Sequence, residues 1–188
     1  MLGDLQEKKA AHYFDLIDED DNGVIEASDF EARVDRLAAA QAVTEAETRE
    51  AIRARVMVWW RHLCAVADAN EDGTVTWDEW RQYWEALDEA ATADDQTRAE
   101  TLNSLDRAAR GTLRAIDTTG SGAVTEAEYA DWLAAWGVAE RDVAFDRLDR
   151  DGTGTLSDED FETAVREFYL SNAPDAPGNA LYGVLDAA

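Results

Sequence analysis

The sequence has little of what cross-links a chain, breaks a helix or anchors a protein in a membrane. Its 188 residues include one cysteine, Cys64, and two prolines, Pro174 and Pro177. A single cysteine excludes an intramolecular disulfide framework and fits a reducing compartment. Both prolines lie near the end, so no proline interrupts a helix before residue 174. No stretch has the length and apolarity of a membrane span, and the first residues lack the apolar core of a signal peptide. We therefore expect a soluble, cytoplasmic protein.

Basic residues are also scarce. Seventeen Lys and Arg stand against 42 Asp and Glu, which gives a formal net charge of −25. A surface of this charge repels phosphate groups, which argues against nucleic acid or an anionic membrane as a partner. The composition favours a protein that attracts cations. We expect a monomer, with no protein partner indicated.

A twelve-residue pattern occurs four times, starting at Asp18, Asp68, Asp117 and Asp149. In each copy oxygen-bearing side chains stand at positions one, three and five, glycine at six, an apolar residue at eight and a carboxylate at twelve. These are the spacings of the EF-hand calcium loop. Calcium takes six to eight oxygen ligands, which a short loop can supply by wrapping around the ion, and the glycine permits the sharp turn. The pattern predicts calcium loops at 18–29, 68–79, 117–128 and 149–160.

Each loop offers side chains at positions one, three, five and twelve, and the backbone carbonyl at position seven. The predicted ligands are Asp18, Asp20, Asn22, Val24 and Asp29 in loop one, Asp68, Asn70, Asp72, Thr74 and Glu79 in loop two, Asp117, Thr119, Ser121, Ala123 and Glu128 in loop three, and Asp149, Asp151, Thr153, Thr155 and Asp160 in loop four. Loop one also carries Glu26 at position nine.

The four loops are not equivalent. Glu79 and Glu128 are long enough to bind calcium through both oxygens. Asp29 and Asp160 are one methylene shorter, which favours six ligands and tolerance of magnesium. Loop three has hydroxyls at positions three and five, which are weaker ligands than carboxylates. We expect three to four calcium ions, with loop two strongest and loops one and four intermediate, whereas charge count alone would place loop one first. The occupancy of loops three and four is open.

Segments with apolar residues at helical spacing flank every loop. We therefore expect an all-α protein of four helix-loop-helix EF-hands, arranged as two pairs in one compact body, because an isolated hand leaves its apolar faces exposed. Residues 1–90 are expected to form the first pair, 97–170 the second, and 171–188 a C-terminal tail that packs on the body. The stretch 90–96 is the expected join.

Local signals place helix starts and short strands. Each of three Thr/Glu pairs is spaced as a capping box: Thr44 with Glu47, Thr76 with Glu79, and Thr125 with Glu128. The residues at loop position eight are apolar, mostly β-branched, and suit a very short antiparallel β-ribbon between paired loops. We expect Ile25 to face Val75, and Val124 to face Leu156.

The four loops, their uneven spacing and the closing segment from Pro174 to Gly183 resemble the sarcoplasmic calcium-binding protein family, particularly its bacterial members of the calerythrin type. The tail also looks like that of calexcitin and the calcium-regulated photoproteins. The resemblance implies two EF-hand pairs facing each other over an aromatic core, and a role in intracellular calcium buffering or transport. In several relatives one hand is degenerate, whereas here every loop keeps its glycine and its first aspartate.

Three functions compete. A calcium buffer is favoured by scarce methionine, because calcium sensors use Met-rich grooves and this chain has only Met57 besides Met1. The alternative is a sensor that exposes an apolar groove and binds a partner protein. A small-molecule binder would line its pocket with tryptophans, but core packing explains these rings more simply: Trp59, Trp60, Trp84 and Trp136. No nucleophile, phosphate-loop or zinc motif stands out, so we expect a non-enzyme.

Overall fold

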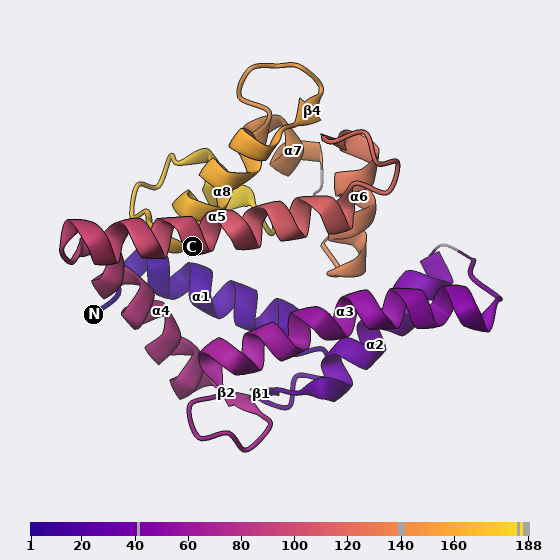
Figure 1. Cartoon of the computed structure of the whole chain (residues 1–188), viewed down its shortest axis with the longest axis horizontal. Helices are drawn as coiled ribbons and strands as arrows, with labels where there is room; N and C mark the ends of the chain where they lie inside the picture. The colour runs from indigo at the N-terminus through magenta and orange to yellow at the C-terminus, as the bar shows by residue number, and fades with distance from the viewer. Residues whose placement is uncertain (41, 139–141, 184, 186–188) are drawn as a thin grey trace. The chain divides into compact units, whose positions relative to one another are not determined.

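The computed structural model describes residues 1–40, 42–138, 142–183 and 185. Within these ranges the chain is mainly helical, and no helix combines the length and apolarity needed to cross a bilayer. The helices are α1 (Asp4–Ile17), α2 (Ala27–Ala40), α3 (Ala46–Ala67), α4 (Trp77–Thr92), α5 (Asp95–Ile116), α6 (Glu126–Ala135), α7 (Asp142–Leu148), α8 (Asp158–Leu170) and the 3-10 helix η1 (Pro177–Ala180) (Figure 1). The strands are β1 (Val24–Ile25), β2 (Val75–Thr76), β3 (Val124–Thr125) and β4 (Thr155–Leu156). The expected all-α fold with short ribbons is confirmed.

The two β-ribbons join the loops in pairs. β1 pairs with β2, beside which it is labelled in Figure 1, and β3 pairs with β4; both pairs are antiparallel. Ile25 stands opposite Val75, and Val124 opposite Leu156, so the predicted register is confirmed. All four side chains are fully buried. Each pair of loops is therefore connected through backbone hydrogen bonds and an apolar contact.

The chain forms two compact units. One is Ala11–Tyr83, and the other combines Met1–Ala10 with Trp84–Ala188. The helices α4 and α5 meet near the expected join, where Asp94 caps α5 through the amides of Gln96 and Thr97. The division into units nevertheless falls inside α1 and α4. The two ends of each of these helices therefore group with different partners.

An aromatic cluster fills the unit Ala11–Tyr83. From α1, Tyr13 packs edge-on against Trp80 with ring centroids 5.5 Å apart, and Phe14 does the same against Trp77 at 5.5 Å. On the neighbouring helices, which pack against each other, α2 contributes Phe30, and its ring lies 5.3 Å from that of Trp60 on α3. These contacts join the helices that flank loops one and two.

The other unit is built on the packing of α5 against α8 and of the tail against α8. Tyr182 is 5% exposed, and its ring centroid lies 4.9 Å from Phe168, 5.5 Å from Trp132 and 5.7 Å from Trp136. The hydroxyl of Tyr129 donates to the carbonyl of Leu181 at 2.8 Å. The tail thus covers the aromatic face of the second EF-hand pair.

The first turns of α1 hold the same tail. Lys9 is fully buried, and its Nζ donates to the carbonyls of Glu167 and Ser171 at 2.9 and 2.6 Å and to Oδ1 of Asn179 at 3.3 Å. Asn179 in turn donates to the carbonyl of Ala173 at 2.9 Å. Because a buried ammonium needs acceptors, this network ties the end of α8 to the tail.

The capping predictions are right at the calcium loops and wrong at α3. Thr125 and Glu128 form the predicted capping box, and Thr76 and Glu79 exchange the same reciprocal bonds at 3.4 and 3.0 Å. The N-cap of α3 is instead Glu45, with no side-chain bond. A box centred on Thr44 requires the helix to begin at residue 45, whereas it begins one residue later.

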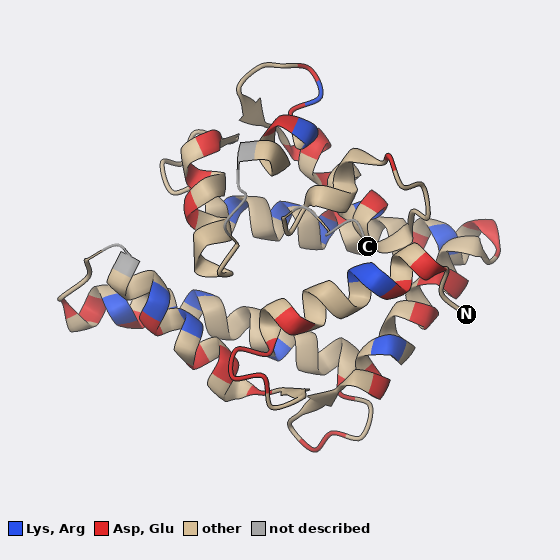
Figure 2. Ribbon diagram, turned by 180° about the vertical axis from the view of Figure 1, so that it is seen from behind, with Lys and Arg blue, Asp and Glu red and all other residues tan. Residues whose placement is uncertain are grey.

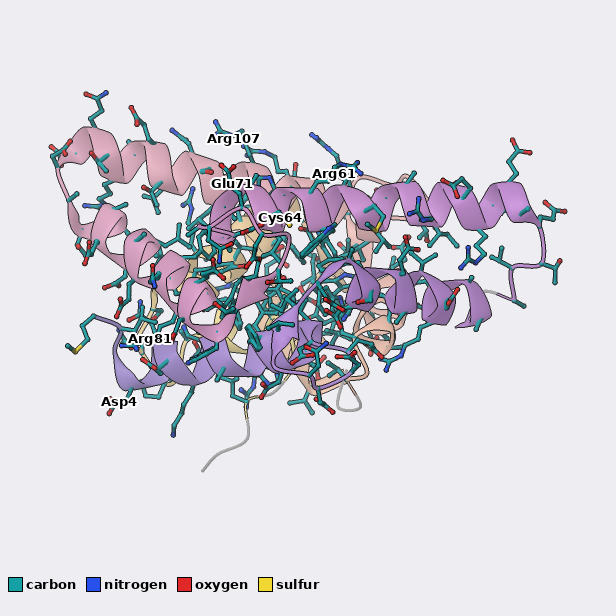
Figure 3. The ribbon with its side chains drawn as sticks, turned by 90° about the horizontal axis from the view of Figure 1, so that it is seen from below. Asp4, Arg61, Cys64, Glu71, Arg81 and Arg107 are labelled. Carbon is teal, nitrogen blue, oxygen red and sulfur yellow. The ribbon has the colours of Figure 1, made fainter. Side chains whose placement is uncertain are left out.

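The tryptophans expected in the core are mostly there. Trp60, Trp84 and Trp136 are buried, and Trp59 is half-buried. Cys64, on the same helix as Trp59, is only half-buried, and Figure 3 shows it on α3 beside the labelled Arg61. Burial, with repulsion from Asp68, raises the pKa of the Cys64 thiol. The thiol is thereby kept in its less reactive protonated form.

Candidate metal centres

The aspartate at position one is held the same way in all four loops. One of its oxygens accepts a hydrogen bond from the amide of residue five at 3.0–3.2 Å, and the other accepts from the glycine at position six at 2.8–3.0 Å. These bonds fold each loop back on the residue that directly follows its incoming helix. The aspartates are Asp18, Asp68, Asp117 and Asp149.

The turn depends on two left-handed residues in each loop. The glycine at position six has φ between 78° and 89° in every copy. Position four is left-handed as well, and loops one and two place Asp21 (φ 56°) and Glu71 (φ 58°) there. Non-glycine residues in this region cost about 1–2 kcal/mol each. Loops one and two therefore hold a strained turn that brings their alternate side chains to one side.

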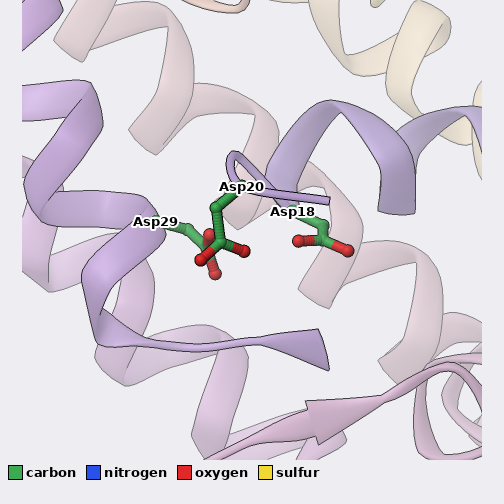
Figure 4. A group of neighbouring side chains, drawn as sticks. All are labelled: Asp18, Asp20 and Asp29. Carbon is green, nitrogen blue, oxygen red and sulfur yellow. The ribbon is translucent and has the colours of Figure 1, made fainter. Parts of the chain in front are cut away.

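Loop one brings its carboxylates together. Asp18, Asp20 and Asp29 each offer an oxygen within 4.8 Å of the others (Figure 4). Calcium oxygens lie about 2.3–2.6 Å from the ion, so ligands on opposite sides stand about 5 Å apart. Over the ranges that the structure describes, this is the one group of three or more Asp, Glu, His or Cys with that spacing. The residues therefore fit a calcium-sized ion.

The carboxylate at position twelve closes loops two and three. Glu79 accepts from the amide of Thr76 at 3.0 Å and from that of Asn70, at position three, at 3.3 Å. Glu128 accepts from the corresponding amides of Thr125 and Thr119, both at 3.0 Å. One carboxylate thus connects the start of each loop to the start of its outgoing helix.

The two shorter carboxylates behave differently from each other. Asp29 is 2% exposed and accepts from the amides of Glu26 at 2.7 Å and Glu19 at 2.9 Å, so it still spans its loop. Asp160 accepts from the amide and hydroxyl of Ser157 at 2.9 and 2.6 Å, and makes no bond to the start of its loop within the described part of the chain. Loops one and four, which the sequence ranks together, therefore differ in closure.

The electrostatics of the loops follow from burial and hydrogen bonding. Burial raises the pKa of Asp29, and repulsion from Asp18 and Asp20 adds to it against two backbone hydrogen bonds. For Glu128, burial also raises the pKa, but hydrogen bonds from Thr125, Thr119 and Thr118 outweigh it and lower the pKa to about 2. A cation placed among such carboxylates removes their mutual repulsion. In Figure 2 the run of acidic residues between α1 and β1 is visible as a red segment.

Hydroxyls replace carboxylates at position five of loops three and four. The hydroxyl of Ser121 donates to the carbonyl of Ala123 at 2.8 Å, and that of Thr153 to the carbonyl of Thr155 at 3.1 Å. Positions five and seven therefore place their oxygens side by side. In loop two the position-five group is a carboxylate, Asp72, so that loop brings more negative charge to the same place.

Sequence reasoning missed the ion pairs made by loop position two. Glu19 pairs with Arg36 of α2, and Arg150 of loop four pairs with Glu167 of α8 at 2.6 Å. In both hands the partner stands seventeen residues further on, with opposite charge. That recurrence is a signal in the sequence. It is visible only when the hands are aligned on their first aspartate.

Comparisons with known proteins agree with this geometry. The family model described as EF hand matches residues 65–82, which contain loop two. Calerythrin from Saccharopolyspora erythraea is 31% identical over 166 residues, covering 84% of this chain and 88% of that protein. A sarcoplasmic calcium-binding protein from amphioxus is 23% identical with a TM-score of 0.66, covering 97% and 98% of the two chains. A calcium-binding protein from Streptomyces coelicolor is 28% identical with a TM-score of 0.64, covering 89% and 99%.

Proposed function

Since this chain belongs to the calerythrin-like family of EF-hand calcium-binding proteins, we propose that it is an intracellular calcium buffer with mixed calcium and calcium/magnesium sites. The observation that carries the proposal is the position of the tail. A calcium sensor must present an apolar groove to a partner when the ion binds. In this protein the aromatic face of the second hand pair is already covered by Leu181 and Tyr182 of the same chain.

The loops support a store of several ions. Each loop folds its first aspartate and its turn in the same way, which favours three to four bound ions. Four calcium ions would leave the protein acidic, because eight positive charges offset only part of −25. Repulsion among the empty carboxylates makes the ion-free form less stable, so binding stabilises the fold.

Selectivity follows from position twelve. Glu79 and Glu128 can give calcium a seventh ligand, whereas Asp29 and Asp160 favour six, the number that magnesium demands. We propose that loops two and three select calcium and that loops one and four accept magnesium. The preformed cluster of loop one supports tight binding there, and the open Asp160 supports weaker binding in loop four.

Isothermal titration with calcium, repeated in excess magnesium, tests the number and selectivity of the sites. We expect three to four ions without magnesium and competition confined to loops one and four. Glu79→Gln should remove or weaken one calcium-selective site, and Asp29→Asn one magnesium-sensitive site. If Glu79→Gln left stoichiometry and affinity unchanged while Asp29→Asn abolished all calcium binding, our assignment of the sites would be wrong.

Each loop also provides its own reporter. The amides of Gly23, Gly73, Gly122 and Gly154 donate to the first aspartate of their loops. Once the eleven glycine signals of ¹⁵N-glycine-labelled protein are assigned, these four report on one loop each. A titration followed by these four signals gives the order of filling. A loop whose glycine signal does not move at millimolar calcium is not a calcium site.

A calcium sensor is the second candidate. It is favoured by the Streptomyces coelicolor relative, whose structure is described as a basis for prokaryotic calcium-mediated regulation. Binding of a hydrophobic dye separates the two functions. A buffer whose tail stays in place binds the dye equally with and without calcium, whereas a sensor binds it strongly only when calcium is added.

A further inference from the structure

The ion pair at loop position two occurs in the hands that have the short carboxylate at position twelve. Hand one combines Asp29 with Glu19 and Arg36, and hand four combines Asp160 with Arg150 and Glu167. Hands two and three have Glu at position twelve. At the two positions that pair in the other hands they carry only small residues: Ala69 and Ala86 in hand two, Thr118 and Ala135 in hand three.

In hand one the pair is part of a larger brace. The side chain of Glu19 is 12% exposed and lies between Arg36 and Arg33, with Nη2 of Arg33 3.8 Å away. The same Nη2 donates at 2.8 Å to the carbonyl of Leu16, in the last turn of α1. Arg33 is 2% exposed, so its charge is held inside the hand. The end of α1, the loop and α2 are therefore connected through one guanidinium.

The brace acts on the residue that the short carboxylate reaches. The backbone amide of Glu19 is the donor that closes loop one on Asp29, at 2.9 Å. In hands two and three the longer Glu79 and Glu128 reach the amide of position three without any such pair. An aspartate is shorter by one carbon–carbon bond, about 1.5 Å. The start of the loop must come that much closer to the outgoing helix.

Hand four has a corresponding ion pair in which the charges are exchanged and only one basic residue takes part. Arg150 is the basic member and Glu167 the acidic one, and Oε2 of Glu167 also accepts from the amide of Gly178 in the tail at 2.8 Å. The side chain of Asp160 is bonded only to Ser157 within the described residues, so in this hand the short carboxylate does not reach the start of its loop. The location of the pair is kept while its polarity is reversed.

We propose that the ion pair between loop position two and the outgoing helix is a positioning brace that lets an aspartate at position twelve serve as a metal ligand in hands one and four. This inference rests on the proposed function, because it concerns the closing of the calcium loops. Glu19, Arg33 and Arg36 in hand one, and Arg150 with Glu167 in hand four, are its members.

Because the charges are exchanged between hands one and four, positioning by the ion pair can be distinguished from the effect of charge near the loop. Glu19→Gln removes a negative charge beside loop one, and Arg150→Gln removes a positive charge beside loop four. If only charge mattered, the first change would weaken calcium binding and the second would tighten it. A brace predicts that both weaken binding at their own loop. We expect the calcium dissociation constant of that loop to rise about tenfold in each case, near the lower end of what one hydrogen bond to a charged group contributes.

The readout is the midpoint of each glycine signal in a calcium titration. Glu19→Gln should shift the midpoint of Gly23, and Arg150→Gln that of Gly154, while Gly73 and Gly122 keep theirs. Asp21→Asn is the matched control for lost charge. Asp21 is exposed, lies in the same loop and has a left-handed φ that Asn tolerates, so the change should cost threefold or less.

Three further measurements test the mechanism. With Asp29→Glu in place, the longer carboxylate no longer needs the brace, so adding Glu19→Gln should cost no more than Asp21→Asn does. In the ion-free protein, Glu19→Gln should speed hydrogen exchange at the amide of residue 19, because that amide loses its bond to Asp29. Arg36→Gln should give a smaller loss than Glu19→Gln, since Arg33 remains.

The outcomes are distinct. Weakening by both Glu19→Gln and Arg150→Gln, with rescue by Asp29→Glu, supports the brace. Tighter binding by Arg150→Gln, no change in either midpoint, or a joint shift of all four glycine signals overturns it. If the unsubstituted protein shows no glycine response to millimolar calcium, the proposed function itself fails, and that result appears before any variant is compared.

Discussion

Replacing Tyr182 with alanine tests whether the tail holds the second hand pair closed. Its ring contacts Phe168, Trp132 and Trp136 at centroid distances of 4.9–5.7 Å and is 5% exposed. Removing a buried aromatic side chain costs about 3–5 kcal/mol. Three aromatic contacts, each adding about 0.5–1.5 kcal/mol beyond burial, place this residue toward the upper part of that range. We therefore expect Tyr182→Ala to lower the free energy of unfolding by about 4 kcal/mol.

Urea unfolding of the calcium-loaded protein measures the loss. The unfolding midpoint should fall for Tyr182→Ala, whereas Asp175→Ala, an exposed change in the same tail, should leave it unchanged within error. Tyr182→Ala should also bind a hydrophobic dye, because the rings of Trp132 and Trp136 lose their cover. If Tyr182→Ala lowered the free energy of unfolding by less than about 1 kcal/mol and bound no dye, the packing argument would be refuted. The ring would then contribute no more to stability than an exposed residue does.

Two other predictions concern backbone space and a buried charge. Gly178→Ala should lower the free energy of unfolding by about 1–3 kcal/mol, because a Cβ there would lie 2.5 Å from the carbonyl oxygen of Ala164. Gly111→Ala, in an open position of α5, should raise it by about 0.5–1 kcal/mol. Thermal unfolding of the two variants measures both changes. Burial lowers the pKa of Lys9 to about 8 from its ordinary 10.5, against the attraction of Glu167. Between pH 8 and pH 10.5, Lys9 keeps its proton in the unfolded chain but has lost it in the folded chain. The free energy of unfolding should therefore rise with pH in this range, by up to about 1.4 kcal/mol per pH unit. Urea unfolding from pH 7.5 to 9.5 should show this rise in stability in the unsubstituted protein and in the control variant Lys8→Gln. Lys9→Gln should not show the rise. If stability rose equally in Lys9→Gln, a group other than Lys9 would be responsible.

The turn of the four loops could be predicted because its determinants are local. The turn, the first aspartate and the position-six glycine lie within twelve residues, and the structure folds all four loops alike. The register of Ile25 with Val75 was also predictable, since an apolar residue at position eight must be buried on one side of a two-residue strand. At Thr44, where the capping-box spacing has no calcium loop beside it, the predicted start of the helix was wrong by one residue.

The sequence indicated a tail on the body, but not the contacts of that tail or the ion pairs at loop position two. Glu19 contacts residues fourteen and seventeen positions later, and Lys9 bonds to Glu167, which lies 158 residues away. A pattern of apolar positions carries no information on which charged side chains meet. The same limit applies to Asp29 and Asp160, which are the same residue at the same position but close their loops differently.

By itself, the sequence determined the local features of this protein: four twelve-residue loops with oxygen-bearing side chains at the spacing that calcium requires, and the pairing of loops through apolar residues. Those properties depend on residues close together along the chain, where backbone geometry allows few arrangements. The tertiary structure alone decided which loop gathers its carboxylates, which charges pair at loop position two, and that Leu181 and Tyr182 lie on the aromatic face of the second hand pair. Those outcomes depend on contacts between distant segments, and each is settled by packing and by the cost of burying a charge without a partner.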